Sequence, residues 1–371
     1  MREQAIYTLA IGELSGLGPV KARQLIQHFG SAQSVWEASA YELSQVDGLR
    51  PEILLNLIRT EGPSALLRSQ EQLQINQDAG GQVALFSDDF YPAALSRCSD
   101  APLAIFYKGQ LPPLGARLVS VIGTRQMSEY GREATWELIK VLSSCGATVV
   151  SGLAYGIDIQ AHRAALEFNI PTIAVLGSGL GKVYPQQHRQ EAKQLQEKGA
   201  LISEFYHTVK PDRENFPKRN RIVAGIAEAT VVVEAGRAGG AWITARLAND
   251  YGREVLAIPG PWNSEVSKGC HDLIAVHAAA ILPAPEDIPR ILGWEVSAPL
   301  QERLFPADAR EVALALARHG APMHIDDLAL SLQLPPHDVQ ALLFELELDG
   351  HIRALPGRFV KLSSTFSPDV Q

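Results

Sequence analysis

One segment of the chain combines basic and aromatic side chains in a pattern suited to nucleic acid. Residues 207–225 read HTVKPDRENFPKRNRIVAG and hold five Lys or Arg residues against two carboxylates, although the whole chain carries a net charge of −8. Phe216 lies among these cations, where its ring can stack on a base while adjacent cations contact phosphates. The segment therefore favours a nucleic-acid ligand. The alternative is a purely structural role for the segment, in which Arg219 and Arg221 form salt bridges and Phe216 is part of the core.

Glycine-bearing segments directly follow several apolar runs of the sequence. They read GTR (123–125), SGLAYGID (151–158), GSGLGKVYP (177–185), EAGRAGGAWITA (234–245) and PGP (259–261). Glycine lets a ligand approach the backbone closely, and a helix that starts in such a loop presents free N–H groups and the positive end of its dipole. Because ligands of open parallel sheets bind beyond the carboxyl ends of the strands, these loops predict an anion-binding rim, most naturally for phosphates.

Nucleotide-cofactor and metal motifs are poorly matched. Gly177, Gly179 and Gly181 do not form GxGxxG, no suitable acid follows about 20 residues later, and GxxxxGK[ST] is absent. Asp158 and His162 resemble half a metal site without a second pair, so we expect a capping aspartate and a packing histidine. Cys270 and His271 are sequence neighbours whose side chains point apart, which disfavours a nucleophile pair. We expect no cofactor, no metal and no catalytic residue.

The elements that must position these loops are short apolar strands alternating with helices. This pattern indicates an α/β domain with a mostly parallel, extended Rossmann-like sheet covered on both faces, over residues 66–295. Residues 66–117 form a connector in which 102–109 is an added strand. The other expected strands are 118–122, 147–151, 171–176, 200–203, 229–233, 254–258 and 279–282.

Both flanks of this domain read as helical. Residues 1–65 contain two helix–Gly turn–helix units, at 14–30 and 46–57, which suggest a SAM-like or helix-hairpin-helix domain. DNA contact by these turns and a simple packing module both stay open. Residues 305–365 outline a winged helix, whose recognition-helix candidate, 338–349, has four acidic residues and no Lys or Arg. We therefore expect that helix to contact protein rather than the major groove.

The bulk composition is that of an ordinary globular protein. Hydrophobic residues make up 46% and charged residues 20%, and no apolar run approaches the roughly 20 residues needed to cross a bilayer. The start, MREQAIYTLA, lacks the features of a secretory signal. Cys98, Cys145 and Cys270 are odd in number and scattered, which disfavours a disulfide framework. We expect a cytoplasmic protein without membrane contact. The negative net charge argues mildly against a protein that coats nucleic acid non-specifically. The local clustering of charged residues therefore decides whether the chain has a nucleic-acid site.

The loop motifs, taken in order, resemble the DprA/Smf family of DNA-processing proteins. The matching stretches are VIGTRQMSEYG, VVSGLAYGIDIQAH, TIAVLGSGLGKVYP, LISEF, NFPKRNRIVAG, VVVEAGRAGGAWITA, VLAIPG and GCHDLI, which lie in this order between residues 121 and 274. The resemblance implies an extended Rossmann fold that binds single-stranded DNA without sequence preference and loads RecA recombinase onto it. It also implies a role in natural transformation and a homodimer with two DNA pockets.

The resemblance also implies a set of DNA-binding residues. Arg125 would grip a phosphate and Phe216 would stack against a base. The sequence departs from the family pattern in three places: Thr124 and Pro261 stand where Ser is common, and Gly239-Gly240 stand where Ser-Gly-Ser is more frequent. The pocket would therefore depend more on backbone N–H groups. The full set implied is Gly123, Thr124, Arg125, Ser151, Gly152, Arg213, Phe216, Arg219, Asn220, Arg221, Gly239 and Gly240.

Two other classes of function compete with this interpretation. A nucleoside-monophosphate phosphoribohydrolase has a similar fold and a PGGxGTxxE signature that supplies a catalytic glutamate. Here GGAWIT is followed by Ala245, Arg246 and Leu247, with no acid before Asp250, so the acid–base group is missing and we expect no enzyme. A pure protein-interaction scaffold is the third possibility, and it would bind no oligonucleotide.

Overall fold

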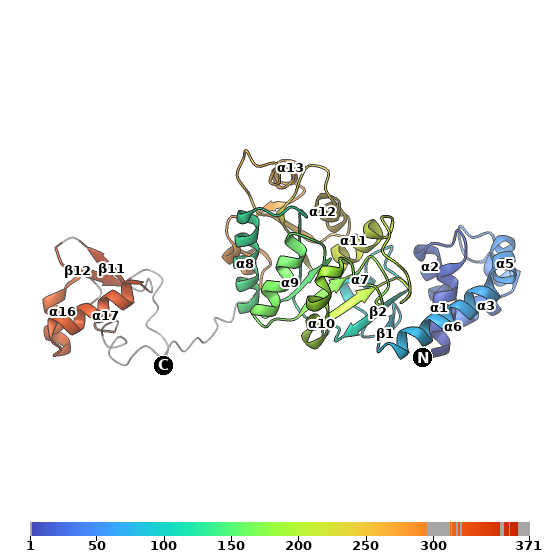
Figure 1. The fold of residues 1–371 in the computed structure, drawn as a ribbon, viewed down its shortest axis with the longest axis horizontal. Coiled ribbons are helices and arrows are strands. Elements are labelled where there is room, and N and C mark those ends of the chain that lie inside the picture. The colour runs from blue at the N-terminus through green and yellow to red at the C-terminus, as the bar shows by residue number, and fades with distance from the viewer. Residues whose placement is uncertain are drawn as a thin grey trace. The chain divides into compact units, whose positions relative to one another are not determined.

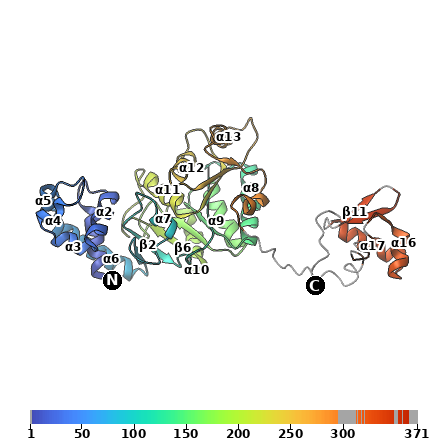
Figure 2. The same cartoon turned by 180° about the vertical axis from the view of Figure 1, so that it is seen from behind.

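The computed structural model describes residues 2–294, 312, 314–316, 318–319, 321–348, 352–355 and 357–362. The chain divides into two compact units, residues 1–296 and 297–371. The first unit contains an α-helical N-terminal region and a large sheet between two layers of helices, as Figures 1 and 2 show from opposite sides. The second is a small domain of helices and a hairpin.

The described part of the first unit contains a nine-stranded sheet in the order β1-β2-β6-β5-β4-β3-β7-β8-β9. Strands β3 to β9 are parallel, whereas β1 and β2 extend one edge in antiparallel fashion. The predicted extended Rossmann-like sheet is thereby confirmed. Its strands are β1 (Gln82–Leu85), β2 (Ala104–Gly109), β3 (Leu118–Gly123), β4 (Thr148–Ser151), β5 (Thr172–Val175), β6 (Ala200–Ser203), β7 (Ala229–Glu234), β8 (Glu254–Ala257) and β9 (Ala280–Ile281).

Helices cover both faces of the sheet because alternate strand residues are apolar on both sides. In β3, Val119 and Val121 face the core formed with α8 and α9, while Leu118 and Ile122 face the core formed with α11 and α12. The covering helices are α7 (Ala93–Ser96), α8 (Glu129–Ser144), α9 (Ile157–Glu167), α10 (Arg189–Lys198), α11 (Asn215–Ile226), α12 (Gly240–Asp250) and α13 (Lys268–Ala275), with short turns η1 (Gln186–His188), η2 (Pro285–Asp287) and α14 (Ile288–Ile291).

The N-terminal region is helical, as predicted. The turns before α2 and α5 contain Gly16 (φ 74°) and Gly48 (φ 73°), and a proline then opens each helix, in agreement with the two Gly-turn units of the sequence. Gly30 ends α2 in the left-handed conformation (φ 79°). Whether this region is SAM-like stays a prediction. The helices are α1 (Arg2–Glu13), α2 (Pro19–Phe29), α3 (Ala32–Glu37), α4 (Ala40–Ser44), α5 (Pro51–Thr60) and α6 (Gly62–Asp78).

Helix α6 and strand β1 are elements that the sequence did not reveal. Residues 66–117 read as a connector, yet α6 continues through the expected boundary at residue 65 as far as Asp78. Its buried face includes Ser69 and Asn76 beside Ala65 and Leu73, so the hydrophobic period of an amphipathic helix is weak. The four-residue β1 is short, and its position at the sheet edge leaves it no continuous apolar pattern.

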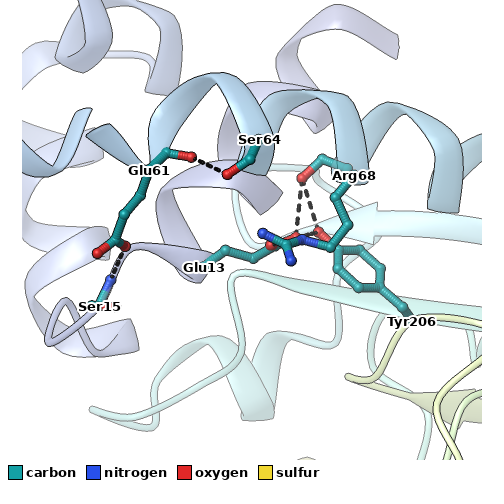
Figure 3. A network of polar contacts seen from close by, with 7 residues as sticks. Glu13, Ser15, Glu61, Ser64, Arg68 and Tyr206 are labelled. Atoms are coloured by element: carbon teal, nitrogen blue, oxygen red, sulfur yellow. Dashed lines mark hydrogen bonds and ion pairs between the residues drawn. The ribbon is translucent and has the colours of Figure 1, made fainter. Parts of the chain in front are cut away.

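A polar network joins the helical region to the sheet domain (Figure 3). The Tyr206 hydroxyl, in the loop after β6, donates to the Glu13 carboxylate of α1, and it lies 2.8 Å from the Ser69 hydroxyl of α6. Arg68 also contacts Glu13, and the Ser15 backbone N–H donates to Glu61 at 2.9 Å. Burial raises the pKa of Tyr206 above its ordinary value, so its hydroxyl stays protonated and keeps donating.

The second unit has the two helices and the hairpin of a winged helix, as predicted. Leu328, Leu343, Leu346 and Val360 form much of its core. The start of the range 305–365 expected for this domain, residues 305–311, lies outside the described residues. The described elements are β10 (Met323–His324), α16 (Ile325–Leu332), α17 (Pro336–Leu348), β11 (Ile352–Leu355) and β12 (Phe359–Leu362), with the sheet order β10-β12-β11.

No helix within the described ranges is long and apolar enough to span a bilayer.

The Tyr206 network predicts a stability effect. Tyr206→Phe removes the hydroxyl and leaves the half-buried Glu13 carboxylate without this donor, so the free energy of unfolding should fall by about 1.5–3 kcal/mol. Urea denaturation measures the change. Tyr41→Phe, at a side chain that is 77% exposed, is the matched control and should leave stability unchanged. Equal stability of wild type and Tyr206→Phe would contradict the assignment.

Candidate nucleic-acid interface

The candidate site lies where the sheet topology reverses. Strands β3 and β7 are parallel neighbours, but β3 leads through α8 to β4 on one side and β7 leads through α12 to β8 on the other. Their outgoing loops therefore separate toward opposite faces and leave a crevice at the carboxyl ends, which is where open α/β sheets bind ligands. A cavity of about 710 Å³ opens there.

Most of the residues predicted for DNA binding line this cavity. They come from loops after β3, β4 and β7 and from the segment that enters α11, so distant parts of the chain meet at one place. The lining members of the predicted set are Gly123, Thr124, Arg125, Gly152, Arg213, Phe216, Arg219, Asn220, Gly239 and Gly240.

Exposed Arg125 and half-buried Phe216 form a cation–aromatic pair in this cavity. The Arg125 guanidinium carbon lies 5.5 Å from the centroid of the Phe216 ring, and Phe216 is half-buried. The Phe216 ring lies against Gly177, where an added Cβ would be 2.9 Å from the ring. The centroids of the Phe216 and Tyr184 rings are 5.9 Å apart. A positive charge thus stands beside an aromatic face that is held in place from behind.

Arg219 is part of the cavity lining but is turned inward. It is 4% exposed, and its guanidinium donates to the backbone carbonyls of Gly152 and Val175, the latter at 2.8 Å. Burial lowers the pKa of Arg219, while the nearby Asp158 carboxylate opposes that shift. Arg219 therefore ties the loop after β4 to the end of β5. Its role is structural, as the alternative expected, but its partners are backbone carbonyls and not the carboxylate of a salt bridge.

Ser151 and Arg221 do not line the cavity, in contrast to the prediction. The Ser151 hydroxyl is buried and donates to the Val121 carbonyl at 2.6 Å. Arg221 is ion-paired with Glu204 and donates to the Asp100 carbonyl. Residues two apart on a helix point to different sides, so Arg219 and Arg221 of α11 cannot both face one site. Burial raises the pKa of Glu204, and the Arg221 charge opposes this.

The N-terminus of α12 supplies unpaired backbone donors to the cavity. Gly239 caps this helix without any side-chain hydrogen bond, which leaves the N–H groups of its first turn available. An added Cβ at Gly239 would meet its nearest atom at 3.6 Å, and one at Gly240 at 3.8 Å, so both positions have room for a side chain. Glycine at these two positions is therefore not needed to avoid a steric clash. Its effect is to leave the backbone N–H groups more accessible than serine would.

Several residues that line the cavity were not predicted to belong to the site. Tyr184, 46% exposed, stands at the rim, where an aromatic residue inside the glycine-bearing loop 177–185 was an available signal. Asp158 is the one carboxylate among the described lining residues, and it is 7% exposed. Burial raises its pKa, opposed by Arg219 and by backbone N–H groups such as that of Ala154, 3.4 Å away. Gly236, Ile243 and Thr244 complete the α12 side.

The residues considered for metal binding or nucleophilic chemistry make structural contacts. His162 is fully buried, its Nδ1 lies 2.7 Å from the Thr172 hydroxyl, and burial lowers its pKa to about 3. His271 donates to the Gly260 carbonyl at 2.9 Å, and burial raises the pKa of the Cys270 thiol to about 12. In the parts of the chain that the structure describes, no three His, Cys, Asp or Glu residues are arranged to hold a metal.

Comparison with known protein families yields two matches. Residues 82–292 match the family described as DNA recombination-mediator protein A, and residues 296–358 match the DprA winged helix domain. The chain is 40% identical to Protein Smf of Escherichia coli over 284 residues, which cover 74% of this chain and 75% of that protein.

Two solved structures share this fold. DNA processing protein A from Streptococcus pneumoniae has a TM-score of 0.63 at 30% identity and covers 78% of this chain and 97% of its own. DNA processing protein A from Helicobacter pylori, described for its single-stranded DNA binding mode, has a TM-score of 0.52 at 26% identity and covers 57% and 95%.

The packing around Arg219 predicts a steric effect at Gly152. An alanine Cβ there would stand 1.9 Å from a guanidinium nitrogen that two carbonyls hold, so Gly152→Ala should lower the free energy of unfolding by about 1–3 kcal/mol. Gly236→Ala, where no atom lies within 4 Å, is the matched control. Urea denaturation compares the two, and equal stabilities would contradict the tight packing.

The buried His162 predicts acid sensitivity. Its pKa falls from 6.5 to about 3 on folding, so between these values the unfolded chain binds a proton that the folded protein excludes. Stability is therefore lost as pH falls below about 6.5, by up to about 1.4 kcal/mol per pH unit from this residue. His162→Gln, which does not titrate, should reduce that slope in urea titrations between pH 7 and pH 5. An unchanged slope would contradict the burial of a neutral imidazole.

Proposed function

The chain belongs to the DprA/Smf family of DNA-processing proteins, and on that premise we propose that its cavity binds single-stranded DNA without sequence preference. The observation that carries this proposal is the Arg125–Phe216 pair, 5.5 Å apart, at the mouth of the topological crevice. A cation and an aromatic face at that spacing suit a phosphate and the base next to it. Every base has an aromatic face, so stacking does not select sequence.

The remaining groups of the cavity support a ligand held by its backbone. The free N–H groups at the start of α12 are donors for phosphate oxygens. Exposed Arg213 adds positive charge to the cavity lining. Arg219 acts indirectly in this proposal, because it holds the loops of β4 and β5 in place. Ser151 and Arg221 would support the surrounding fold rather than touch DNA.

The cavity supports binding rather than nucleotide hydrolysis. A phosphoribohydrolase needs a carboxylate that reaches its substrate as an acid–base group. Asp158 is 7% exposed and lies beside Arg219, whereas Glu234, at the end of β7, accepts hydrogen bonds from both the hydroxyl and the backbone N–H of Ser128. Both carboxylates thus have structural partners, and the proposed role involves neither a cofactor nor a metal.

The proposed role extends to recombination. We propose that the protein forms a homodimer with two DNA pockets and loads RecA recombinase onto single strands in the cytoplasm, during natural transformation or general recombination. The family description as a recombination mediator supports this extension. The acidic first turn of α16 and Asp338 of α17 suit a protein-contact role for the winged helix better than DNA contact.

Arg125→Ala tests the site assignment. Loss of a charge-assisted phosphate contact should weaken binding of a short oligonucleotide by about 10- to 150-fold and reduce the salt dependence of log K by about 0.7. Fluorescence anisotropy measured at several salt concentrations gives both values. Arg132→Ala removes an exposed arginine that is paired with Glu129 outside the cavity, and should bind like wild type. Wild-type affinity and salt slope in Arg125→Ala would refute the assignment.

A further inference from the structure

An exposed tryptophan lies in a loop that follows the carboxyl end of a strand, on the side of the sheet where the cavity opens. Trp262 is 85% exposed, the highest value among the described large apolar side chains. It follows β8, which pairs in parallel with β7 through Val232 and Ala257, so the loop after β8 leaves the sheet next to the loop that forms the α12 wall of the cavity.

Helix α13, which follows the loop of Trp262, begins tightly against this cavity wall. The Gly269 N–H donates to the Ala235 carbonyl at 2.7 Å, and an added Cβ at Gly269 would lie 2.6 Å from both the Ala235 and the Gly236 carbonyl oxygens. Ala235 and Gly236 themselves line the cavity. The segment that carries Trp262 is therefore anchored, at its Gly269 end, to residues that line the candidate DNA site.

Hydrogen bonds also restrain the turn on which the tryptophan is placed. The Tyr130 hydroxyl donates to the Pro259 carbonyl at 2.9 Å, and His271 donates to the Gly260 carbonyl at the same distance. The Ser264 N–H donates to the Pro261 carbonyl at 3.0 Å, which closes a tight turn with Trp262 at its second position. The backbone is thus constrained while the indole extends into solvent, so little backbone freedom remains to be lost on binding.

The surroundings of Trp262 suit a nucleic-acid strand better than a protein partner. Pro261, Asn263 and Glu265 are exposed beside it, and the Glu265 carboxylate is paired with Lys268. None of these three neighbours is aromatic, whereas the centre of a protein interface is usually a cluster of large apolar side chains. Arg237, on the adjacent loop, is 68% exposed and pairs with Asp272 at 3.0 Å. An exposed ion pair contributes little energy, so Arg237 can exchange this partner for a phosphate.

We infer that Trp262 is a second stacking platform, on which a base of the same DNA strand rests after the strand leaves the cavity past the N-terminus of α12. This inference rests on the proposed function and extends it, because it assigns a path to the strand beyond the Arg125–Phe216 pair. Short strands fill the cavity alone, whereas longer strands also reach Trp262. Affinity should therefore rise with length in a way that depends on the indole.

A length series of oligothymidines tests this inference by fluorescence anisotropy at constant salt. For strands of about 20 nucleotides Trp262→Ala should lose about 5- to 150-fold in affinity, whereas strands of about 5 nucleotides should bind as they do to wild type. Trp262→Phe keeps an aromatic face and should retain most of the long-strand affinity. Tyr41→Ala, at a 77% exposed aromatic residue of α4, is the matched control and should bind both lengths normally.

Tryptophan fluorescence supplies a second readout. The other four tryptophans are half-buried, so the signal lost in Trp262→Phe reports the exposed indole. Long strands should quench that signal and short strands should leave it unchanged.

Three outcomes would overturn the inference. They are unchanged long-strand affinity in Trp262→Ala, an equal loss for both lengths, and altered self-association with unchanged DNA affinity. Arg125→Ala separates these results from a failure of the proposed function, because it should weaken binding of both lengths. If Arg125→Ala bound short strands normally, the cavity assignment itself would fail.

Discussion

A buried guanidinium holds together the floor of the candidate site. Arg219 spans the end of β5 and the loop after β4 through two backbone carbonyls, and its charge lies beside the buried Asp158. Carbonyls at strand ends have no partner within the sheet, and a buried cation needs acceptors, so each satisfies the other. The loop geometry around Gly152 depends on this contact, and Phe216 and Asn220 lie on the same helix.

This acidic protein presents a local cationic surface at one rim of the sheet domain. The segment 207–225 is rich in Lys and Arg, yet two of its arginines are inside the fold, Arg219 against carbonyls and Arg221 against Glu204. Arg213 and Lys218 stay exposed, and Arg125 joins them from the loop after β3. The charge available to a ligand therefore comes from geometry at one rim and not from the net charge of the chain.

The strands and the glycine-bearing loops of the rim could be predicted because their signals are local, whereas the full set of binding residues followed from the family resemblance. A strand buried on both faces is a continuous apolar run, and a glycine-bearing loop after it marks the rim. Helix α6 gave no such signal, since Ser69 and Asn76 occupy its buried face. The directions of Arg219 and Arg221 were also unpredictable, because they depend on Gly152, Val175 and Glu204, residues that only the fold brings near. Tyr184 was missed although its loop had been singled out.

Helix α6 leads into β1 after a turn of only a few residues, and Glu13 and Tyr206 clamp its flank. A 17-residue helix is about 25 Å long and stiff. The N-terminal helices are therefore connected to the sheet through a stiff helix and not through a flexible linker. A force on these helices would therefore reach the β1–β2 edge of the sheet directly, because no flexible linker lies between α6 and β1.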